Sequence, residues 1–206
     1  EERRKKEKES RKNSILKAAR KLFFERGFIS VTVDLIAAKA EVSKGSIYLY
    51  FDSKEEIYTQ ILISANIDRH KEWNVFAKQG GTASEALIAF AHEYVSYFLD
   101  NNELFRILMT FMLQAENMNL TDEQNTQLIH TTNENVHVIA EILQRGVESG
   151  EFIAGMDVRR MQFAIWGLLN GVISLYIYTG APERRGERIF TIVHDSLNAL
   201  LKGIKS

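Results

Sequence analysis

A single proline in 206 residues is the feature that most constrains how this chain folds. Proline breaks helices, and turn-rich β proteins contain many prolines. The chain can therefore run long helices with few interruptions. Apolar residues recur at steps of three and four through most of the sequence, and no run alternates as a strand does. We expect an all-α fold.

Cap residues and glycines divide the chain into nine predicted helices. Ser53 with Glu56 and Thr121 with Gln124 have the spacing of capping boxes, and Asp157 is a further N-cap. No internal repeat of 20–50 residues is visible. The predicted helices cover about 14–26, 33–40, 44–51, 54–79, 84–100, 103–115, 121–149, 158–179 and 183–203.

Composition excludes several classes of protein. The absence of Cys removes disulfides, thiolate catalysis and Cys-based zinc or iron–sulfur sites. An apolar fraction of 45% is too high for a disordered chain. No apolar run reaches the roughly 18 residues of a membrane span, and a charged run stands where a signal peptide would be apolar. We expect a cytoplasmic protein with no membrane partner.

The formal charge of -1 hides an uneven distribution. Residues 1–60 hold 14 basic and 10 acidic side chains, hence +4, and residues 61–206 hold 12 and 17, hence -5. This asymmetry indicates two parts with different partners. Residues 1–13 hold seven basic and four acidic side chains and no apolar one. Such a run is more typical of a solvated tail or frayed helix start than of an arm that enters the DNA minor groove.

Residues 32–51 have the spacing of a helix-turn-helix, in which the second of two short helices lies in the DNA major groove. Its small core would consist of Ile36, Ala40, Val42, Ile47 and Phe51. The second helix also carries polar and aromatic groups that can donate to phosphate oxygens, at Ser43, Lys44, Ser46, Tyr48 and Tyr50. Because any pair of amphipathic helices can mimic this pattern, the pattern alone leaves DNA binding at even odds.

Three segments carry a resemblance to a known family. They are ILKAARKLFFERGF at 15–28, VSKGSIYLYF at 42–51 and SKEE at 53–56, with Thr32 and Ile36-Ala37 between the first two. About 45 residues in this order resemble the DNA-binding domain of the TetR (tetracycline-repressor-like) family of transcriptional regulators. Glu41 departs from the pattern, because the family's turn usually has Gly there. A Glu in a left-handed conformation would be strained, so the turn either differs or carries strain.

The resemblance implies a DNA-binding domain at 1–53, with the charged arm at 1–13, and a helical effector-binding and dimerisation domain at 54–206. It implies a ligand-responsive repressor that is released from a palindromic double-stranded operator. Phosphate contacts would come from Thr32, Tyr48, Tyr50 and Lys54. Lys44, Gly45 and Ser46 would face base edges, and Ser43 would cap the helix and could donate to a phosphate. Tyr48 could instead be a core residue, but its polar neighbours favour DNA.

The resemblance also implies a homodimer formed through the last two helices and a small hydrophobic effector. Met and aromatic side chains suit an adaptable apolar pocket, although most such residues are core. The candidate ligand-binding residues are Trp73, Phe76, Phe90, Tyr94, Phe98, Phe105, Met109, Met112, His137, Trp166 and Asn170.

Other functions have weaker support in the sequence. His130, Glu134 and His137 share a helix face, but three such residues more often belong to a solvated face than to a metal site. His194 beside Asp195 has no serine placed by a motif, so we expect no catalytic residue, no metal and no cofactor, and hence no enzyme. An all-α binding or carrier protein remains an alternative, which duplex binding that weakens with salt would exclude.

Overall fold

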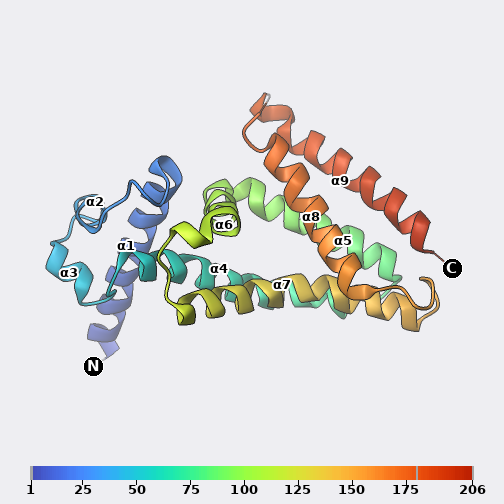
Figure 1. The fold of residues 1–206 in the computed structure, drawn as a ribbon, viewed down its shortest axis with the longest axis horizontal. Coiled ribbons are helices and arrows are strands. Elements are labelled where there is room, and N and C mark those ends of the chain that lie inside the picture. Colours follow the sequence, from blue (N-terminus) through green and yellow to red (C-terminus); the bar gives the residue numbers. More distant parts are fainter. Residues whose placement is uncertain (1, 180, 206) are drawn as a thin grey trace. The chain divides into compact units, whose positions relative to one another are not determined.

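The computed structural model describes residues 2–179 and 181–205, and the regular structure of those residues is helical (Figure 1). Within them, the only β pairing is an isolated antiparallel bridge between Phe152 and Lys205. The all-α prediction is confirmed. The helices are α1 (Glu2–Arg26), α2 (Val33–Lys39), α3 (Lys44–Tyr48), α4 (Lys54–Ala77), α5 (Ala83–Asp100), α6 (Asn102–Gln114), the short 3-10 helix η1 (Ala115–Asn117), α7 (Asp122–Glu148), α8 (Val158–Tyr176) and α9 (Pro182–Ile204).

The predicted caps form hydrogen bonds at the expected helix starts. Thr121 and Gln124 make the reciprocal pair of a capping box, with donor–acceptor distances of 3.0 and 3.2 Å. Before α4, the Ser53 hydroxyl accepts from the Glu56 N–H at 3.1 Å. The Glu56 carboxylate, however, accepts from the N–H of Asp52 at 2.6 Å. This cap thus satisfies a donor one residue earlier than a standard capping box does.

Helix α1 begins at Glu2, about twelve residues before the predicted start near 14. Lys, Arg and Glu are good helix formers, so this segment needs no apolar face to be helical. Ion pairs one turn apart support it, between Arg3 and Glu7 at 3.0 Å and between Lys6 and Glu2 at 3.3 Å. Of the two expectations for residues 1–13, a solvated tail or a helix start, the structure shows helix from Glu2 onward. Glu1 of the predicted 1–13 arm lies outside the described residues.

The chain divides into two compact units. Unit 1 is Glu1–Asn66 with Glu103–Thr131, and unit 2 is Ile67–Asn102 with Thr132–Ser206. Helices α4 and α7 each contribute residues to both units. The predicted domain boundary between residues 53 and 54 stays a prediction.

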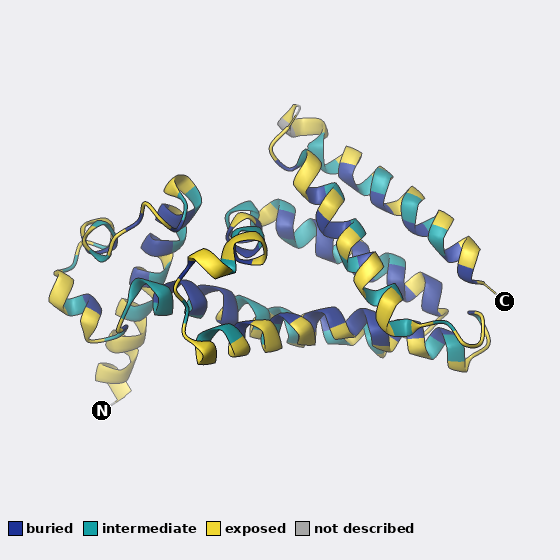
Figure 2. Cartoon of the chain, in the orientation of Figure 1, coloured by how far each residue is buried: buried dark blue, intermediate teal, exposed yellow. Residues whose placement is uncertain are grey.

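In unit 1, α1 packs on α2 and α2 packs on α3. Ile15, Ile36 and Ile47, one from each helix, are fully buried. Figure 2 colours buried residues dark blue, and such residues alternate with exposed ones along the helices. Tyr58 of α4 donates to the carbonyl of Ile107 in α6 at 2.5 Å. Burial raises the pKa of the Tyr58 hydroxyl, which therefore stays protonated and able to donate.

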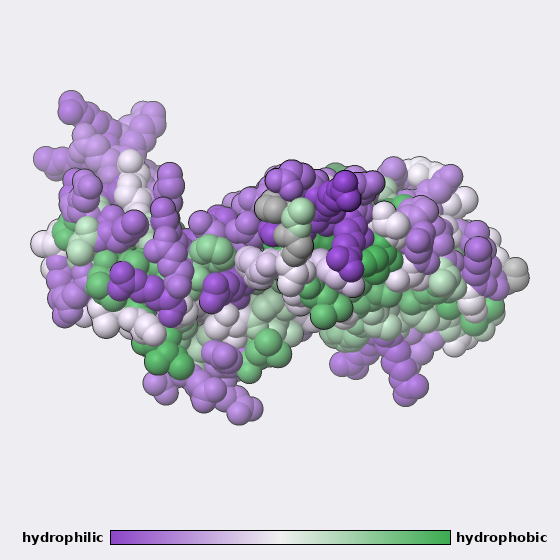
Figure 3. Space-filling model, turned by 90° about the horizontal axis from the view of Figure 1, so that it is seen from above, coloured by the Kyte–Doolittle hydropathy of each residue, from purple (hydrophilic) through white to green (hydrophobic). Residues whose placement is uncertain are grey.

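In unit 2, α5, α8 and α9 pack against one another. One side of α9 is buried, and its outer side is polar over the first turns, where Figure 3 shows strongly hydrophilic side chains beside apolar ones. The stripe on α9 has the period of an amphipathic helix. The buried residues of this stripe are Ile189, Val193, Leu197, Leu201 and Ile204.

The segment after α7 folds back onto the start of α5. The Glu151 carboxylate accepts from the N–H groups of Ala83 at 2.6 Å and Ser84 at 3.1 Å, so it caps a helix that begins 68 residues earlier in the chain. Burial favours the neutral form of Glu151 and would by itself raise the pKa of its carboxyl. Hydrogen bonds from Ser84 and Ala83 outweigh it and hold the pKa of this carboxyl below its ordinary value. The neighbouring Phe152 ring is buried directly against Gly146 of α7.

We expect the substitution Gly146→Ala to destabilise the protein by about 1–3 kcal/mol, the usual effect of overpacking a core. A Cβ at position 146 would overlap the Phe152 ring and lie 2.9 Å from the Cβ of Ala83. Denaturant unfolding at a fixed chain concentration measures the effect. Gly203→Ala is the matched control, because a Cβ there meets nothing within 4 Å. Equal stability of the two variants would contradict this packing of Phe152 on α7.

Candidate functional site

Helices α2 and α3 begin with the capping residues that the sequence predicts. The Thr32 hydroxyl accepts from the N–H of Leu35 at 3.3 Å. The Ser43 hydroxyl accepts from the N–H of Ser46 at 3.1 Å. Between the helices, the N–H of Val42 donates to the carbonyl of Ala37 at 3.0 Å and closes a tight turn. This is the geometry of a helix-turn-helix.

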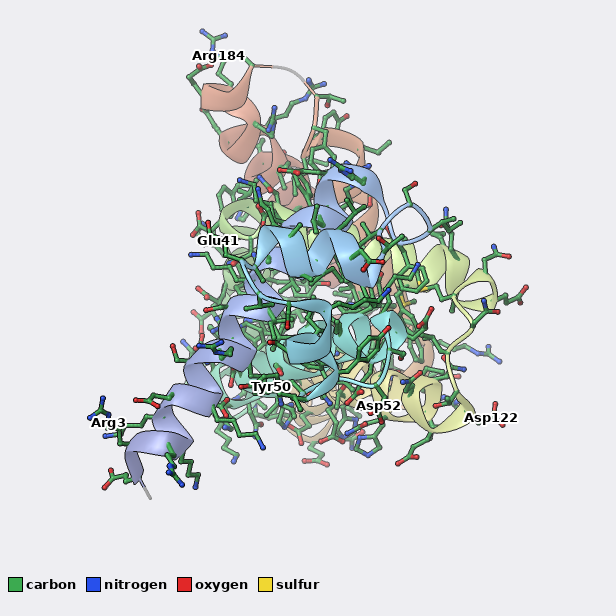
Figure 4. The ribbon with its side chains drawn as sticks, turned by 90° about the vertical axis from the view of Figure 1, so that its left-hand side faces the viewer. Arg3, Glu41, Tyr50, Asp52, Asp122 and Arg184 are labelled. Atoms are coloured by element: carbon green, nitrogen blue, oxygen red, sulfur yellow. The ribbon has the colours of Figure 1, made fainter. Side chains whose placement is uncertain are left out.

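Glu41 lies in this turn, and its φ of 56° is in the left-handed region. Of the two outcomes expected for a Glu at this position, the strained turn is the one found. For a residue with a Cβ, the left-handed backbone conformation is about 1–2 kcal/mol less favourable than the right-handed conformation. Figure 4 looks onto this end of unit 1 and shows the Glu41 side chain at the outer edge of the turn.

The outer side of α3 is exposed. Tyr48 is 48% exposed, so the structure rejects the alternative that it is a core residue. Lys44 and Gly45 are also exposed, while Ser46 and Tyr50 are half-buried. Gly45 has no side chain, and the nearest atom that its Cβ would meet is the Ser43 hydroxyl at 3.9 Å, so another molecule could approach the backbone closely there.

Several of the predicted DNA-contact residues have partners within the protein. The Ser43 and Ser46 hydroxyl oxygens share a hydrogen bond of 2.8 Å. The Lys54 ammonium donates to the carbonyl of Phe28 at 3.0 Å and lies 4.2 Å from the centre of the Phe28 ring. Lys54 therefore ties the start of α4 to the loop after α1. Its contact with a phosphate stays a prediction, as do those of the other residues.

Asp34 belongs to this surface too, although the sequence pattern does not single it out. Its carboxylate lies 2.8 Å from the Lys44 ammonium. The hydrogen bond to Asp34 raises the pKa of Lys44 above its ordinary value. The two residues lie ten positions apart on different helices, so helical spacing could not have paired them.

Aromatic side chains gather in unit 2, where α4 meets α5. The Trp73 ring lies 5.6 Å from Phe90, 5.0 Å from Tyr94 and 6.4 Å from Phe98, measured between ring centres. Tyr97 adds an edge contact with Trp73 at 5.7 Å. The structure thus brings four of the predicted ligand-binding residues together, and Phe76 joins them through Phe90 at 6.1 Å.

A chain of hydrogen bonds runs into this aromatic cluster. Tyr94 donates to the Asn170 side-chain oxygen at 2.8 Å and accepts from the Trp166 indole at 3.1 Å. Asn170 donates to the Trp166 carbonyl at 3.0 Å. Burial raises the pKa of Tyr94, so its hydroxyl stays protonated. By contrast, the Trp73 indole N–H is buried and has no hydrogen-bond partner among the described residues.

The remaining predicted ligand-binding residues lie elsewhere. Phe105, Met109 and Met112 belong to unit 1, where Phe105 is buried and Met112 is exposed. His137 is exposed on α7, 4.0 Å from Glu141. In the described part of the chain, no three metal-ligating side chains gather. Nor does any helix there have the length and apolar character needed to cross a bilayer.

The chain matches two family models and resembles characterised regulators. Residues 15–61 match the model described as bacterial regulatory proteins of the tetR family, and residues 80–189 match the tetracyclin repressor-like C-terminal domain. The fatty acid metabolism regulator protein of Bacillus subtilis is 29% identical over 175 residues, which cover 84% of this chain and 86% of that protein. The transcriptional repressor KstR2 of Rhodococcus jostii is 26% identical over 154 residues, covering 73% of this chain and 72% of that protein.

A solved structure shows the same fold. The transcriptional regulator FadR of Bacillus subtilis in complex with stearoyl-CoA superposes with a TM-score of 0.75. The alignment covers 93% of this chain and 98% of that one, at 24% sequence identity.

We expect Glu41→Gly to stabilise the protein by about 0.5–1 kcal/mol. The change removes about 1–2 kcal/mol of left-handed strain and adds part of that back as lost chain entropy. Denaturant unfolding measures the change. Glu41→Ala removes the same charge and keeps the strain, so it should be no more stable than the parent. If both variants gained equally, the charge and not the backbone would be the cause.

Proposed function

The chain belongs to the tetR family of bacterial regulatory proteins, and we propose that it is a homodimeric repressor that a long-chain acyl-CoA releases from a palindromic operator. It is a DNA-binding transcriptional regulator that responds to a ligand. The named relatives are regulators, and we propose that this chain likewise acts without catalysis, in the cytoplasm. The repressor name of one relative supports the sign of regulation.

The exposed side of α3 is the observation that supports the proposed DNA-binding site. Lys44, Gly45 and Ser46 stand at the start of the second helix of a helix-turn-helix, where residues reach base edges in the major groove. Tyr48 and Tyr50 follow on the same short segment and present hydroxyls that can donate to phosphates. Thr32 stands at the start of α2, and the α2 dipole favours an anion there.

The unpaired indole N–H of Trp73 is the observation that supports the proposed effector site. A buried donor without a partner is costly, and proteins keep few of them without a use. Here it lies inside an aromatic cluster whose other polar groups, Tyr94, Asn170 and Trp166, bond to one another. An acyl chain would suit the aromatic surface, and the thioester oxygen of an acyl-CoA could accept from Trp73. The likeness to regulators of fatty acid metabolism supports this class of ligand.

Helix α4 provides a direct connection from effector to DNA. It begins at Lys54, a few residues after α3, and carries Trp73 nineteen residues later in the sequence. We propose that bound effector favours a conformer in which α4 is displaced and the two α3 helices of the dimer no longer fit half-sites about 34–36 Å apart.

We expect stearoyl-CoA to lower the affinity for an operator duplex by about 5- to 150-fold, the usual range of allosteric coupling. The duplex would be recovered by selection from random DNA, and fluorescence anisotropy would measure its affinity. CoA and stearate, each supplied alone, are the ligand controls and should have little effect. Operator affinity that stearoyl-CoA leaves unchanged, or that CoA alone lowers equally, would contradict the acyl-CoA proposal.

The variant Trp73→Phe keeps an aromatic ring and removes the indole N–H. We expect it to bind the operator as the parent does and to need about two- to tenfold more stearoyl-CoA for release, the effect of removing one hydrogen bond. An unchanged response to stearoyl-CoA would remove Trp73 from the effector site.

The exposed apolar side of α8 supports a homodimer. Phe163 is 43% exposed and Leu175 is 65% exposed. Between them, Gly167 and Gly171 stand four residues apart, and a Cβ at either would meet nothing within 4 Å. Small residues let a second helix approach closely, and a two-fold axis would place the same surface of a second copy opposite. The buried stripe of α9 serves the core of unit 2, so the exposed apolar surface that supports the dimer belongs to α8.

Leu175→Asp should weaken the dimer and, with it, operator binding, because a desolvated carboxylate would be buried in the interface. Sedimentation equilibrium measures the dimer dissociation constant, which we expect to rise at least tenfold. Thr191→Asp, at an exposed polar position of α9, is the control for added charge. A monomeric parent chain would contradict the homodimer outright.

A further inference from the structure

The N-terminal part of α1 is an exposed helix that the family match does not include. The match begins at residue 15, and α1 begins at Glu2. The core of unit 1 starts at Ile15, and residues 2–11 are all exposed. About three turns of helix thus project beyond the helix-turn-helix without serving its core.

Charges are sorted between two faces of this projecting helix. At 3.6 residues per turn, the five basic residues Arg4, Lys5, Lys8, Arg11 and Lys12 fall within about 120° of its circumference. Over residues 4–12, no acidic residue falls on that sector. Arg3 and Lys6 lie on the other side, where they pair with Glu7 and Glu2. We call the five-residue sector the basic face of α1.

The basic face lies beside the end of α3. Arg4, Lys8 and Arg11 line a groove of about 470 Å³ together with Leu49 and Tyr50. The acidic residue of this groove, Glu7, is paired with Arg3 at 3.0 Å. Lys12 lies 5.8 Å from the centre of the Phe51 ring. In Figure 4, α1 runs past Tyr50 and out to Arg3 at its far end.

We infer that the basic face of α1 binds the phosphate backbone of the operator, next to the groove that α3 enters. This inference rests on the proposed function, and it extends the DNA contact to residues outside the helix-turn-helix. The chemistry is that of an anion with regularly spaced charges. Residues 4–12 span roughly 12 Å of helix, and one DNA strand offers a phosphate about every 3.4 Å along its axis. The basic face is therefore long enough to meet more than one phosphate.

A phosphate contact differs from an arm that enters the minor groove. An arm that reads groove width or base edges must be extended. Residues 4–12, by contrast, are the N-terminal part of helix α1. Backbone contacts fix the position of a protein on the duplex and carry no sequence information. The basic face therefore adds affinity for every sequence and leaves the preference of α3 unchanged.

The test compares two double variants of the same helix, each of which removes two positive charges. Arg4→Gln with Lys8→Gln changes the basic face, and Arg3→Gln with Lys6→Gln changes the other side. Gln preserves helix propensity, which circular dichroism checks. Affinity for the selected operator and for a random-sequence duplex of equal length is measured across a series of salt concentrations.

The slope of log affinity against log salt falls by about 0.9 for each phosphate that the protein no longer neutralises. In the variant Arg4→Gln with Lys8→Gln, each protomer of the dimer would leave two phosphates without a cation, four in all. We therefore expect the magnitude of the slope to fall by about 3.6, and by the same amount on the operator and on the random-sequence duplex. Arg3→Gln with Lys6→Gln should leave the slope within about 1 of the parent. Equal decreases from the two variants, no decrease from either, or a decrease confined to the operator overturns the inference. A parent chain that binds no duplex overturns the proposed function as well.

Discussion

A helix of five residues has no stability of its own, and the surface that we propose to read DNA is such a helix. Isolated helices shorter than about 12–15 residues are marginal in water, because nucleation costs more than a few hydrogen bonds return. Helix α3 exists because Ile47 is fully buried, because α3 packs on α2 and because Ser43 caps its first turn. These interactions fix the positions of the exposed groups of α3. Substitutions at Ile36 or Ile47 would therefore displace the proposed DNA-contact residues, although neither side chain faces solvent.

Much of this architecture could be predicted because it depends on local chemistry. Thr32, Ser43, Thr121 and Asp157 act as caps where short polar residues precede apolar periodicity. The burial of Ile47 and the exposure of Tyr48 follow from their places on a short amphipathic helix. A family resemblance located the same surface independently, since that resemblance is concentrated in residues that form the turn and its core.

What could not be predicted depends on contacts between distant residues or on features without periodicity. Helix formation at 2–13 leaves no apolar signal, because charged side chains and solvent sustain it. The pair of Lys44 with Asp34 and the cap that Glu151 provides for α5 each join separate helices. His137 and Met112 have suitable chemistry for a pocket, but their exposure depends on how α6 and α7 pack. Only the folded chain distinguishes them from Tyr94 and Asn170.

The ion pair between Lys44 and Asp34 has a consequence for how the protein searches DNA. An ammonium whose charge is already balanced by a carboxylate adds little to attraction toward phosphates in general. The tip of α3 is thus close to neutral, and its lysine gains most from a partner that replaces Asp34 with well-aimed acceptors, such as the edge of a guanine. In the proposed complex with DNA, a surface of this kind would hold incorrect sequences weakly. It can leave them quickly while charges elsewhere keep the protein near the duplex.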